Sequence, residues 1–457
     1  MDVEILARLQ FAFTISFHYI YPPLSIGLGL CMVAMEGLYL KTGDKLYEEM
    51  TKFFTRIFAL IFGLGVATGI VMEFEFGTNW ATYSKYVGDV FGSALAAEGI
   101  FAFALESGFL GVVLFGWGRV KPRVHFFATV MVFLGSMFSA IWIVVANSWQ
   151  QTPSGFRIVG EGMDARAEIT DFWAMVFNPS SVERIMHVWV GAFLAGSFLV
   201  LSISAYYLLK HRHVHFAKAA FRIALVIATV CSLSQLFIGH KSAEVVAEHQ
   251  PAKLAAMEGH FDSLAAADMF LFGYIDKEKE KAVGLKIPGG LSFLTHQDFN
   301  APIKGLRSFP VQDRPGSLNV VFQSYHLMVM IGIFLIVLTL YACWLWRKGT
   351  LFDKKWLLRL FLFSVLLPQV ANQVGWYTAE TGRQPWVVYG LLRTSDALSK
   401  AVTANQIVFS LILFTLVYAL LFLLFLYLLN KKIQHGPGGG YIQHSPQLET
   451  MAEQFKL

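Results

Sequence analysis

Nine apolar runs, each long enough to cross a lipid bilayer, constrain this chain more than any other feature of its sequence. A membrane-spanning helix needs about 20 mainly apolar residues, and in hydrocarbon only helices or closed barrels satisfy their backbone hydrogen bonds. Barrel strands alternate apolar and polar residues over about 10 positions, and these runs do not alternate. The sequence therefore predicts an all-α, polytopic membrane bundle of nine helices. The predicted spans are residues 11–35, 53–75, 93–117, 124–149, 184–209, 219–240, 320–346, 357–379 and 404–430.

Composition supports a membrane class and argues against nucleic-acid binding. Apolar residues make up 56% of the chain and charged residues 15%, against about 25% charged in soluble proteins. The basic residues behind the net charge of +5 are scattered between the spans and form no aromatic-flanked patch. Cys31, Cys231 and Cys343 each lie in an apolar run without CxxC spacing. They are therefore expected to be packing residues, with no zinc site, thiol redox motif or covalent haem attachment.

Lysine and arginine in the short loops predict the orientation, because cytoplasmic loops carry an excess of both. The loops after the first, third, fifth, seventh and ninth spans are basic, whereas loop 76–92 has only Lys85 and loop 150–183 is acidic. The N-terminus is therefore expected outside and the C-terminus in the cytoplasm. Asp2 and Glu4 stand where a cleavable leader would be basic, so the first span is expected to be retained.

The chain divides into four predicted regions. Residues 1–240 hold the first six spans, and residues 241–319 form a long polar loop on the outer side. Residues 320–430 hold the last three spans, and residues 431–457 form a flexible, glycine-rich cytoplasmic tail. A loop as long as 241–319 indicates function or disorder, and consecutive prolines at 22–23 predict a kink in the first span.

Ionisable residues inside spans are expensive, so each is a functional candidate. His18 in the first span suits either packing against a neighbouring helix or ligation of a metal or haem. His187 and Met328 begin two inward-running spans at similar depth, and histidine with methionine is an axial pair of six-coordinate haem. Methionine also fills gaps in cores, so that alternative stays open for Met328.

Three carboxylates in or next to the spans are further functional candidates. Glu98 and Glu106 lie about 80° apart on one face of the span 93–117, where unpaired carboxylates are protonated or line a proton path, or else bond to a neighbouring helix. Glu380 precedes Arg383 and suits either an ion pair or an iron ligand. Most of these residues fall toward the outer side. Their spacing alone does not separate a redox enzyme from a proton-coupled transporter.

Several specific motifs carry a resemblance to a known family. They are Arg8-Leu-Gln-Phe-Ala12, Gly65-Val-Ala-Thr-Gly69, Met72-Glu-Phe-Glu-Phe-Gly-Thr-Asn-Trp80, Ala97-Glu-Gly99, Leu105-Glu-Ser107 and Gly382-Arg-Gln-Pro-Trp386. With nine spans and an outer N-terminus, the chain resembles subunit I of cytochrome bd, the haem-bearing subunit of a terminal oxidase, over essentially every span.

This resemblance implies three haems and assigns residues to them. A low-spin haem b would be held by His187 and Met328. Two high-spin haems, one a haem b and the other a haem d or a third haem b, would be held by His18 and Glu380. Which macrocycle takes which of these two ligands stays open. Further matched positions are Glu98 beside the high-spin pair, Glu106, Ser107 and Ser139 on the inward proton route, and Arg383 and Trp386 in the motif that supports the haem pair.

The long outer loop corresponds to the family's quinol-binding loop, in which Lys253 and Glu258 match a functional pair. The loop is short, which resembles the short-loop branch that includes cyanide-insensitive members. His326 stands where the long-loop branch would have arginine, next to the expected low-spin haem.

The resemblance implies quinol oxidation at the outer face and electrogenic reduction of dioxygen to water, without proton pumping or copper. It implies a bacterial inner-membrane complex with lipid, a haem-free subunit II and a small single-helix subunit. It leaves ubiquinol and menaquinol both open. The alternatives from the residues alone are a proton-coupled transporter, a quinol cytochrome without oxygen chemistry and, more weakly, a membrane scaffold.

Overall fold

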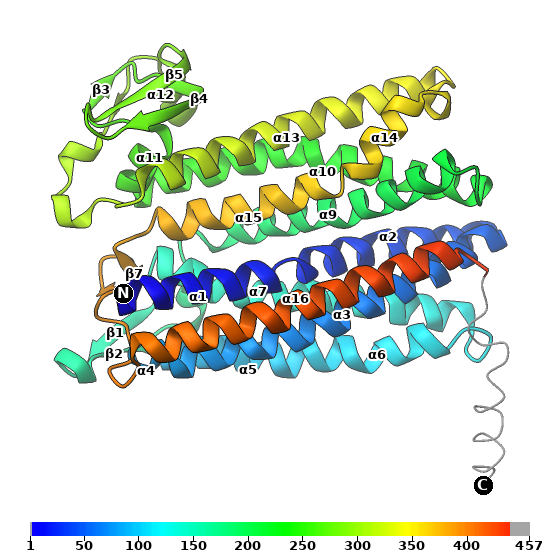
Figure 1. Cartoon of the computed structure of the whole chain (residues 1–457), viewed down its shortest axis with the longest axis horizontal. Coiled ribbons are helices and arrows are strands. Elements are labelled where there is room, and N and C mark those ends of the chain that lie inside the picture. The colour runs from blue at the N-terminus through cyan, green and yellow to red at the C-terminus, as the bar shows by residue number, and fades with distance from the viewer. Residues whose placement is uncertain (1, 439–457) are drawn as a thin grey trace, which may run out of the picture.

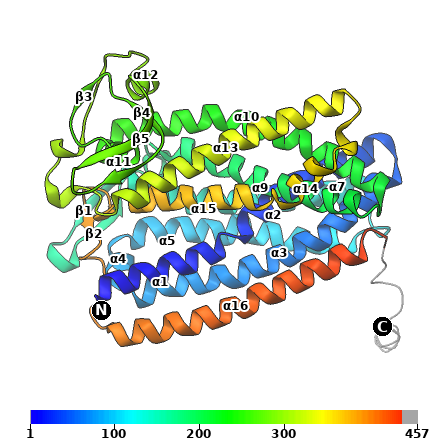
Figure 2. The same ribbon diagram turned by 45° about the horizontal axis from the view of Figure 1, so that its top comes forward.

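The computed structural model describes residues 2–438. In that part of the chain, nine helical spans are long and apolar enough to cross a membrane, which confirms the predicted fold class. The spans run side by side along an elongated bundle (Figure 1). One end of the bundle carries the N-terminus and the small strands, and the opposite end carries the last turn of the final helix (Figures 1 and 2).

The bounds of the spans place every later residue. They are α1 (Val3–His18) with α2 (Tyr21–Thr42), α3 (Lys45–Thr78), α5 (Gly88–Ala97) with the π-helical turn η1 (Glu98–Phe103) and α6 (Ala104–Phe115), α7 (Pro122–Gln151), α9 (Ser181–Leu209), α10 (Val214–His249), α13 (Leu318–Arg347), α14 (Lys355–Phe363) with α15 (Leu366–Thr381), and α16 (Ala404–His435).

The first span is broken rather than merely kinked. α1 ends at His18 and α2 begins at Tyr21, with the consecutive prolines 22–23 in the first turn of α2, where the missing N–H groups cost little. Gln373 of α15 donates its Nε2–H to the Ser16 carbonyl at 2.8 Å beside the break. A neighbouring helix therefore satisfies backbone that the break leaves without a helical partner.

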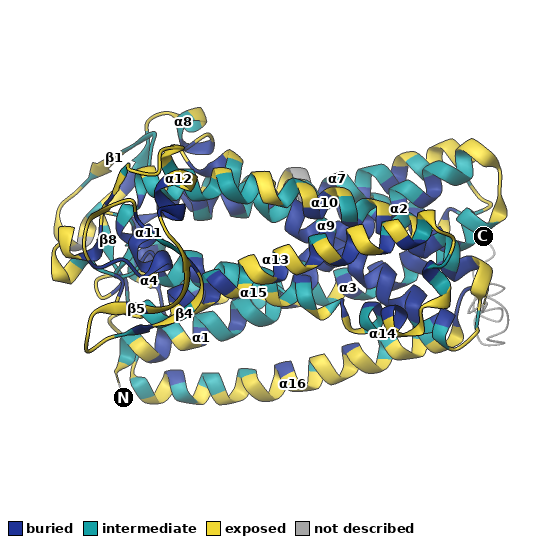
Figure 3. Ribbon diagram, turned by 90° about the horizontal axis from the view of Figure 1, so that it is seen from above, coloured by how far each residue is buried: buried dark blue, intermediate teal, exposed yellow. Residues whose placement is uncertain are grey.

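The core lies where α2, α9 and α10 pack together. In the most apolar 18-residue stretch of α9, 83% of the residues are buried, whereas the corresponding share in α16 is 11%. α16 lies at the edge of the bundle, and its surface is largely exposed (Figure 3). α2 and α9 approach closely at Gly27 and Gly196, where a Cβ on either residue would collide with the backbone of the other helix. Small residues allow such close contact between membrane helices.

Apart from η5, which lies between α13 and α14, the shorter elements gather at the end that carries the N-terminus, and the strands within residues 2–438 form four two-stranded sheets. The helices are α4 (Ala81–Tyr86), α8 (Phe172–Val176), α11 (Pro251–Glu258) and α12 (Gly290–His296). The strands are β1 (Phe156–Val159) with β2 (Arg166–Ile169), β3 (Leu264–Ala265) with β6 (Pro302–Ile303), β4 (Met269–Asp276) with β5 (Lys281–Ile287), and β7 (Trp386–Val388) with β8 (Leu392–Arg393). Short 3₁₀ turns are η2 (Gly162–Asp164), η3 (Leu306–Ser308), η4 (Val311–Asp313) and η5 (Leu351–Asp353).

Several helices extend beyond the predicted spans, as α3 does from residue 53 back to Lys45. The extensions of α10 and α16 reach into the predicted loop and tail. α10 continues past residue 240 to His249, because its polar outer turns stay helical beyond the apolar run. α16 continues past residue 430 to His435 and stops at Gly436, whose φ of 77° favours glycine. The rest of the predicted flexible tail, residues 439–457, lies outside the described residues.

Candidate functional site

A cavity of about 1600 Å³ lies within the bundle, bounded by α1, α3, α7, α9, α10, α13 and α15. Typical ligand pockets measure about 300–1000 Å³, so this one has room for more than a single small molecule. The four predicted iron ligands, His18, His187, Met328 and Glu380, all line it. The sequence placed them on four separate helices, and the fold brings them to one cavity.

His18, at the end of α1, has polar contacts with two residues of α3, the Gly65 backbone and the Thr68 side chain. Its Nδ1 lies 3.0 Å from the Thr68 hydroxyl oxygen of α3. That hydroxyl could accept a hydrogen bond from Nδ1–H, which would leave Nε2 as the ligating nitrogen. Gly69 faces the imidazole, and a Cβ there would lie 3.2 Å from His18 Cε1. Thr68 therefore orients the imidazole ring, and the missing side chain of Gly69 leaves space beside it.

Like His18, His187 contacts a polar side chain, and Met328 faces a glycine. The Gln235 side-chain amide lies 3.1 Å from His187 Nδ1, and its Oε1 has no partner in the orientation shown. Gln235 Nε2 also donates to the His187 carbonyl oxygen at 3.3 Å. Gln235 therefore contacts the Nδ1 side of the ring, and Nε2 is the ring nitrogen on the other side, where a metal would bind. Gly375 of α15 faces Met328, because a Cβ there would lie 2.8 Å from the sulfur.

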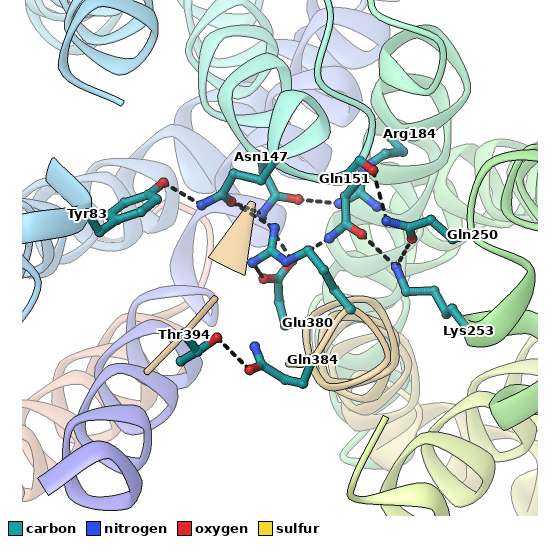
Figure 4. Close-up of polar contacts among 11 residues, drawn as sticks. Tyr83, Asn147, Gln151, Arg184, Gln250, Lys253, Glu380, Gln384 and Thr394 are labelled. Atoms are coloured by element: carbon teal, nitrogen blue, oxygen red, sulfur yellow. Dashed lines mark hydrogen bonds and ion pairs between the residues drawn. The ribbon is translucent and has the colours of Figure 1, made fainter. Parts of the chain in front are cut away.

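Glu380, at the end of α15, is surrounded by hydrogen-bond donors (Figure 4). Asn147 Nδ2 and Gln151 Nε2 each donate to its Oε1 at 3.1 Å. Arg383, which is 4% exposed, donates to its Oε2 and also to Gln150 Oε1 at 3.1 Å. Both alternatives from the sequence therefore remain compatible with the structure: Glu380 is ion-paired, and it also lines the cavity.

Lys253 joins this network from the loop side (Figure 4). Its ammonium group donates to Gln151 Oε1 at 2.6 Å and to Gln250 Oε1. The side chain is 3% exposed. Burial lowers the pKa of Lys253 well below its ordinary value, and the charges of Arg184 and Arg383 act in the same direction, while Glu380 opposes them.

Glu258 faces a different neighbourhood from Lys253. Its carboxyl group bonds to the Tyr325 hydroxyl of α13 and to the backbone N–H of Phe270, and Oε2 has no partner. Burial raises the pKa of Glu258 to about 7. The two residues are five positions apart on α11, about 140° around a helix. They line the same cavity with separate hydrogen-bond partners.

Two serines on one face of α7 donate hydrogen bonds to two of the predicted carboxylates. The Ser139 hydroxyl donates to Glu98, which opens η1, and the Ser136 hydroxyl donates to Glu106 on α6. π-Helical turns are frequent at functional sites. Ser107, predicted beside Glu106, is exposed and donates to the Phe103 carbonyl instead.

Two other predicted residues have no place in the cavity wall. His326 is buried, with Nδ1 2.8 Å from the Phe322 carbonyl and Nε2 2.9 Å from the Phe270 carbonyl. Trp386 begins β7, and the Arg393 guanidinium lies over its ring at 4.4 Å. Their predicted roles beside the cofactors stay predictions.

Sequence reasoning missed several polar residues that hold the site. Asn147 lies near the end of the predicted span 124–149, and Gln150 and Gln151 directly follow it. Such amides at the end of an apolar run were the available signal. Arg184 lies one turn before His187 and Ser136 one turn before Ser139, but both look like ordinary residues of a long span. Gln235 was a polar residue inside a span and could have been found by the rule applied to His18.

The residues fit an iron porphyrin. Among residues 2–438, no three His, Cys, Asp or Glu side chains converge on one metal position. A porphyrin supplies four ligands of its own, so the protein needs only one or two per iron, which matches single ligands spread around one cavity. Gly69 and Gly375 keep space free beside two of them.

The chain is similar to known proteins over most of its length. Residues 6–437 match the family model for cytochrome bd terminal oxidase subunit I. Cytochrome bd ubiquinol oxidase subunit 1 of Bacillus subtilis (strain 168) is 39% identical over 446 residues, covering 95% of this chain and 94% of that protein. Cytochrome bd-II ubiquinol oxidase subunit 1 of Escherichia coli (strain K12) is 34% identical, covering 95% and 97%. The structure of bd oxidase from Geobacillus thermodenitrificans matches with a TM-score of 0.88 at 28% identity, covering 95% of this chain and 99% of the matched one.

Proposed function

Because the chain belongs to the cytochrome bd terminal oxidase subunit I family, whose members are haem-containing quinol:oxygen oxidoreductases that act with a subunit II, we propose that it oxidises quinol at the loop-bearing end of the bundle and reduces dioxygen to water inside it. One observation carries the proposal. His18, His187, Met328 and Glu380 line the same cavity as Glu258 of the loop segment.

The cavity residues divide into ligands and the groups that orient them. His187 and Met328 would hold a low-spin haem b, with Gln235 orienting His187. His18 and Glu380 would hold two high-spin haems, one haem b and the other haem d or a third haem b, with Thr68 and the Asn147–Gln151–Arg383 group orienting them. Haem iron at these ligands supplies one-electron transfer and oxygen-binding chemistry.

Glu258 is the group that would take a proton from the quinol. Its pKa of about 7 suits a general base near neutral pH. The unpartnered Oε2 provides an acceptor atom, and Tyr325 fixes the other side of the carboxyl group. Quinol donates from a hydroxyl group, so a carboxylate within hydrogen-bond distance would receive that proton as the electron leaves.

Glu106 and Glu98 would hold the protons that oxygen reduction consumes. Each carboxyl group receives a hydroxyl hydrogen bond from the same face of α7, and both line the cavity. The basic loops 41–52 and 119–123 support a cytoplasmic position for the far end of the bundle. Proton release at the loop end and uptake from the far end would make turnover electrogenic without pumping.

The proposed setting is a bacterial inner membrane, where the chain acts with a subunit II and with a small single-helix subunit. Haem extraction identifies the third haem as haem d or haem b, and turnover assays with ubiquinol and menaquinol identify the substrate.

The first experiment is a reduced-minus-oxidised spectrum of the purified complex, repeated with carbon monoxide and accompanied by haem extraction. A low-spin haem b together with a carbon-monoxide-binding high-spin haem supports the proposal. His187→Ala and Met328→Leu should each abolish the low-spin signal while carbon monoxide binding persists. An intact complex without haem would refute the oxidase and favour a proton-coupled transporter.

A further inference from the structure

Three cations gather around a single carboxylate near the loop end of the cavity, and Figure 4 shows two of them, Arg184 and Lys253, with Glu380. They are Arg184 of α9, Lys253 of α11 and Arg383, and the carboxylate is Glu380. Arg383 is directly ion-paired with Glu380. The structure therefore holds one cation–carboxylate pair and two further cations in the same space.

Arg184 and Lys253 bond to amide oxygens instead of carboxylates. Arg184 Nη2 donates to Asn147 Oδ1, and Lys253 donates to Gln151 and Gln250. Asn147 and Gln151 in turn donate to Glu380, so each amide separates one cation from the only carboxylate of the network. A guanidinium has five N–H groups and an ammonium has three, so both cations keep donors beyond these bonds.

The other carboxylates of the cavity wall do not pair with these two cations in the described part of the chain. Glu183 is the neighbour of Arg184 in the chain and points about 100° away around the helix. Glu258 bonds to Tyr325, and Glu98 and Glu106 bond to serines of α7. Within the described residues, neither Arg184 nor Lys253 forms an ion pair with any carboxylate.

Two uncompensated cations beside an apolar cavity are costly. Removing a charge from water costs several kcal/mol unless an opposite charge and hydrogen bonds compensate it. Arg184 and Lys253 both line the cavity, so an anionic occupant would supply the missing charge. Arg184 lies one turn before His187, and Lys253 is connected to Glu380 through Gln151. The negative charge of the occupant would therefore lie between two proposed iron ligands.

We propose that Arg184 and Lys253 form a binding site for two carboxylates, namely propionate side chains of the porphyrins held by His187 and Glu380. This inference rests on the proposed function, since it names the groups that would seat its cofactors. It also gives Lys253 a structural reason to face the cavity and not Glu258. Asn147, Gln151 and Gln250 then act as positioning residues that hold both cations at the propionates.

The test uses the whole complex with its partner subunit, grown so that the porphyrin propionate carboxyl carbons carry ¹³C. Redox-induced infrared difference spectra then identify carboxylate bands that shift with the label. Arg184→Gln and Lys253→Gln should each shift these labelled bands and lower the midpoint potential of at least one haem, because a nearby positive charge stabilises the more electron-rich state. Arg184→Lys, which keeps the charge, should restore most of the potential.

Arg222→Gln is the matched control. Arg222 lies on α10 over the Trp346 and Phe352 rings, at 5.9 and 5.5 Å, outside the cavity wall. This variant should leave the labelled bands and the potentials unchanged.

Several outcomes would overturn the inference while leaving the oxidase in place. They are a haem-loaded complex whose labelled bands are the same in wild type, Arg184→Gln and Lys253→Gln, or a change confined to phosphate bands, which would identify a lipid headgroup as the anion. Arg184→Lys keeps the test valid if the Gln variants do not assemble, because replacing a guanidinium by an ammonium must shift the bands of a bound carboxylate. A wild-type complex without haem would instead refute the proposed function.

Discussion

Gly375 of α15 faces the sulfur of Met328 on α13, and a Cβ atom at position 375 would lie 2.8 Å from that sulfur. Real Cβ contacts are essentially never this short, so a larger residue would displace the methionine or the helix. Because Met328 is a proposed iron ligand, the glycine controls the space that this ligand uses.

Gly375→Ala should therefore disturb the low-spin haem while leaving carbon monoxide binding intact. The expected result is a weaker low-spin band in the reduced spectrum and a new ligand-binding fraction. Gly63→Ala on α3 is the control, since a Cβ there meets nothing within 4 Å. An unchanged low-spin spectrum in Gly375→Ala would argue against Met328 as a ligand.

The raised pKa of Glu258 gives quinol oxidation a pH dependence. The carboxylate form accepts the quinol proton, so kcat/KM should rise as pH increases through about 7 and then level off. Glu258→Gln should remove this inflection and slow oxidation about 10²-fold, as expected for loss of a general base. Glu278→Gln, on the exposed hairpin turn, should behave like wild type.

The same group links pH to stability. At pH values below about 4.5, the carboxyl is neutral in the folded and the unfolded chain. As pH rises through about 7, the folded protein must hold an ionised carboxylate in a buried position, so this contribution to stability is lost. Glu258→Gln should therefore raise the thermal unfolding midpoint at pH 8 and have little effect at pH 4. A larger effect at low pH would contradict the raised pKa.

The structure and the sequence motif point to different serines as the partner of Glu106. The motif Leu105-Glu-Ser107 predicts Ser107, and the structure shows Ser136. Ser136 donates to Glu106, whereas Ser107 donates to a backbone carbonyl and is exposed. A hydrogen bond to a charged group is worth about 1.5–3 kcal/mol, so Ser136→Ala should slow oxygen reduction about tenfold at unchanged haem content. Ser107→Ala should have the smaller effect. Oxygen-electrode turnover measures both, and the reverse order would refute the proposed partner of Glu106.

The glycine contact between α2 and α9 should dominate local stability. A Cβ at Gly27 would collide with the Ala192 carbonyl and approach Gly196 N to 2.6 Å. Gly27→Ala should cost about 3 kcal/mol, the upper range for overpacking, and lower the thermal unfolding midpoint of the complex. Gly77→Ala meets nothing within 4 Å and should be neutral. Equal midpoints for the two variants would show that the helices separate readily.

The spans were predictable because hydrocarbon allows few structures for long apolar runs. The breaks within them were not fully predictable. The prolines at 22–23 predicted a kink, but the hydrogen bond that Gln373 donates to the Ser16 carbonyl beside the break comes from a distant span. The π-helical turn at Glu98 contains one glycine, Gly99, and a single glycine within an apolar run does not predict a π-helical turn.

The candidate ligands were found because each is an ionisable or sulfur-bearing residue in an apolar run. Their supporting residues were harder to find. Whether Asn147 and Gln151 face Glu380 depends on how α7 is rotated against α15, which no single span determines. The separate partners of Lys253 and Glu258 likewise depend on where α11 sits, and the chain gives that position only through tertiary contacts.

The loop segment has a buried part and an exposed part. This difference determines where the length of the loop can change. α11 carries Lys253 and Glu258 and is buried over most of its length, whereas the turn between β4 and β5, residues 277–280, is exposed. Lengthening a flexible loop costs little, about 0.6 kcal/mol per doubling. Extra residues inserted at this turn would enlarge the loop without moving either site residue, so loop length and catalytic geometry can evolve independently.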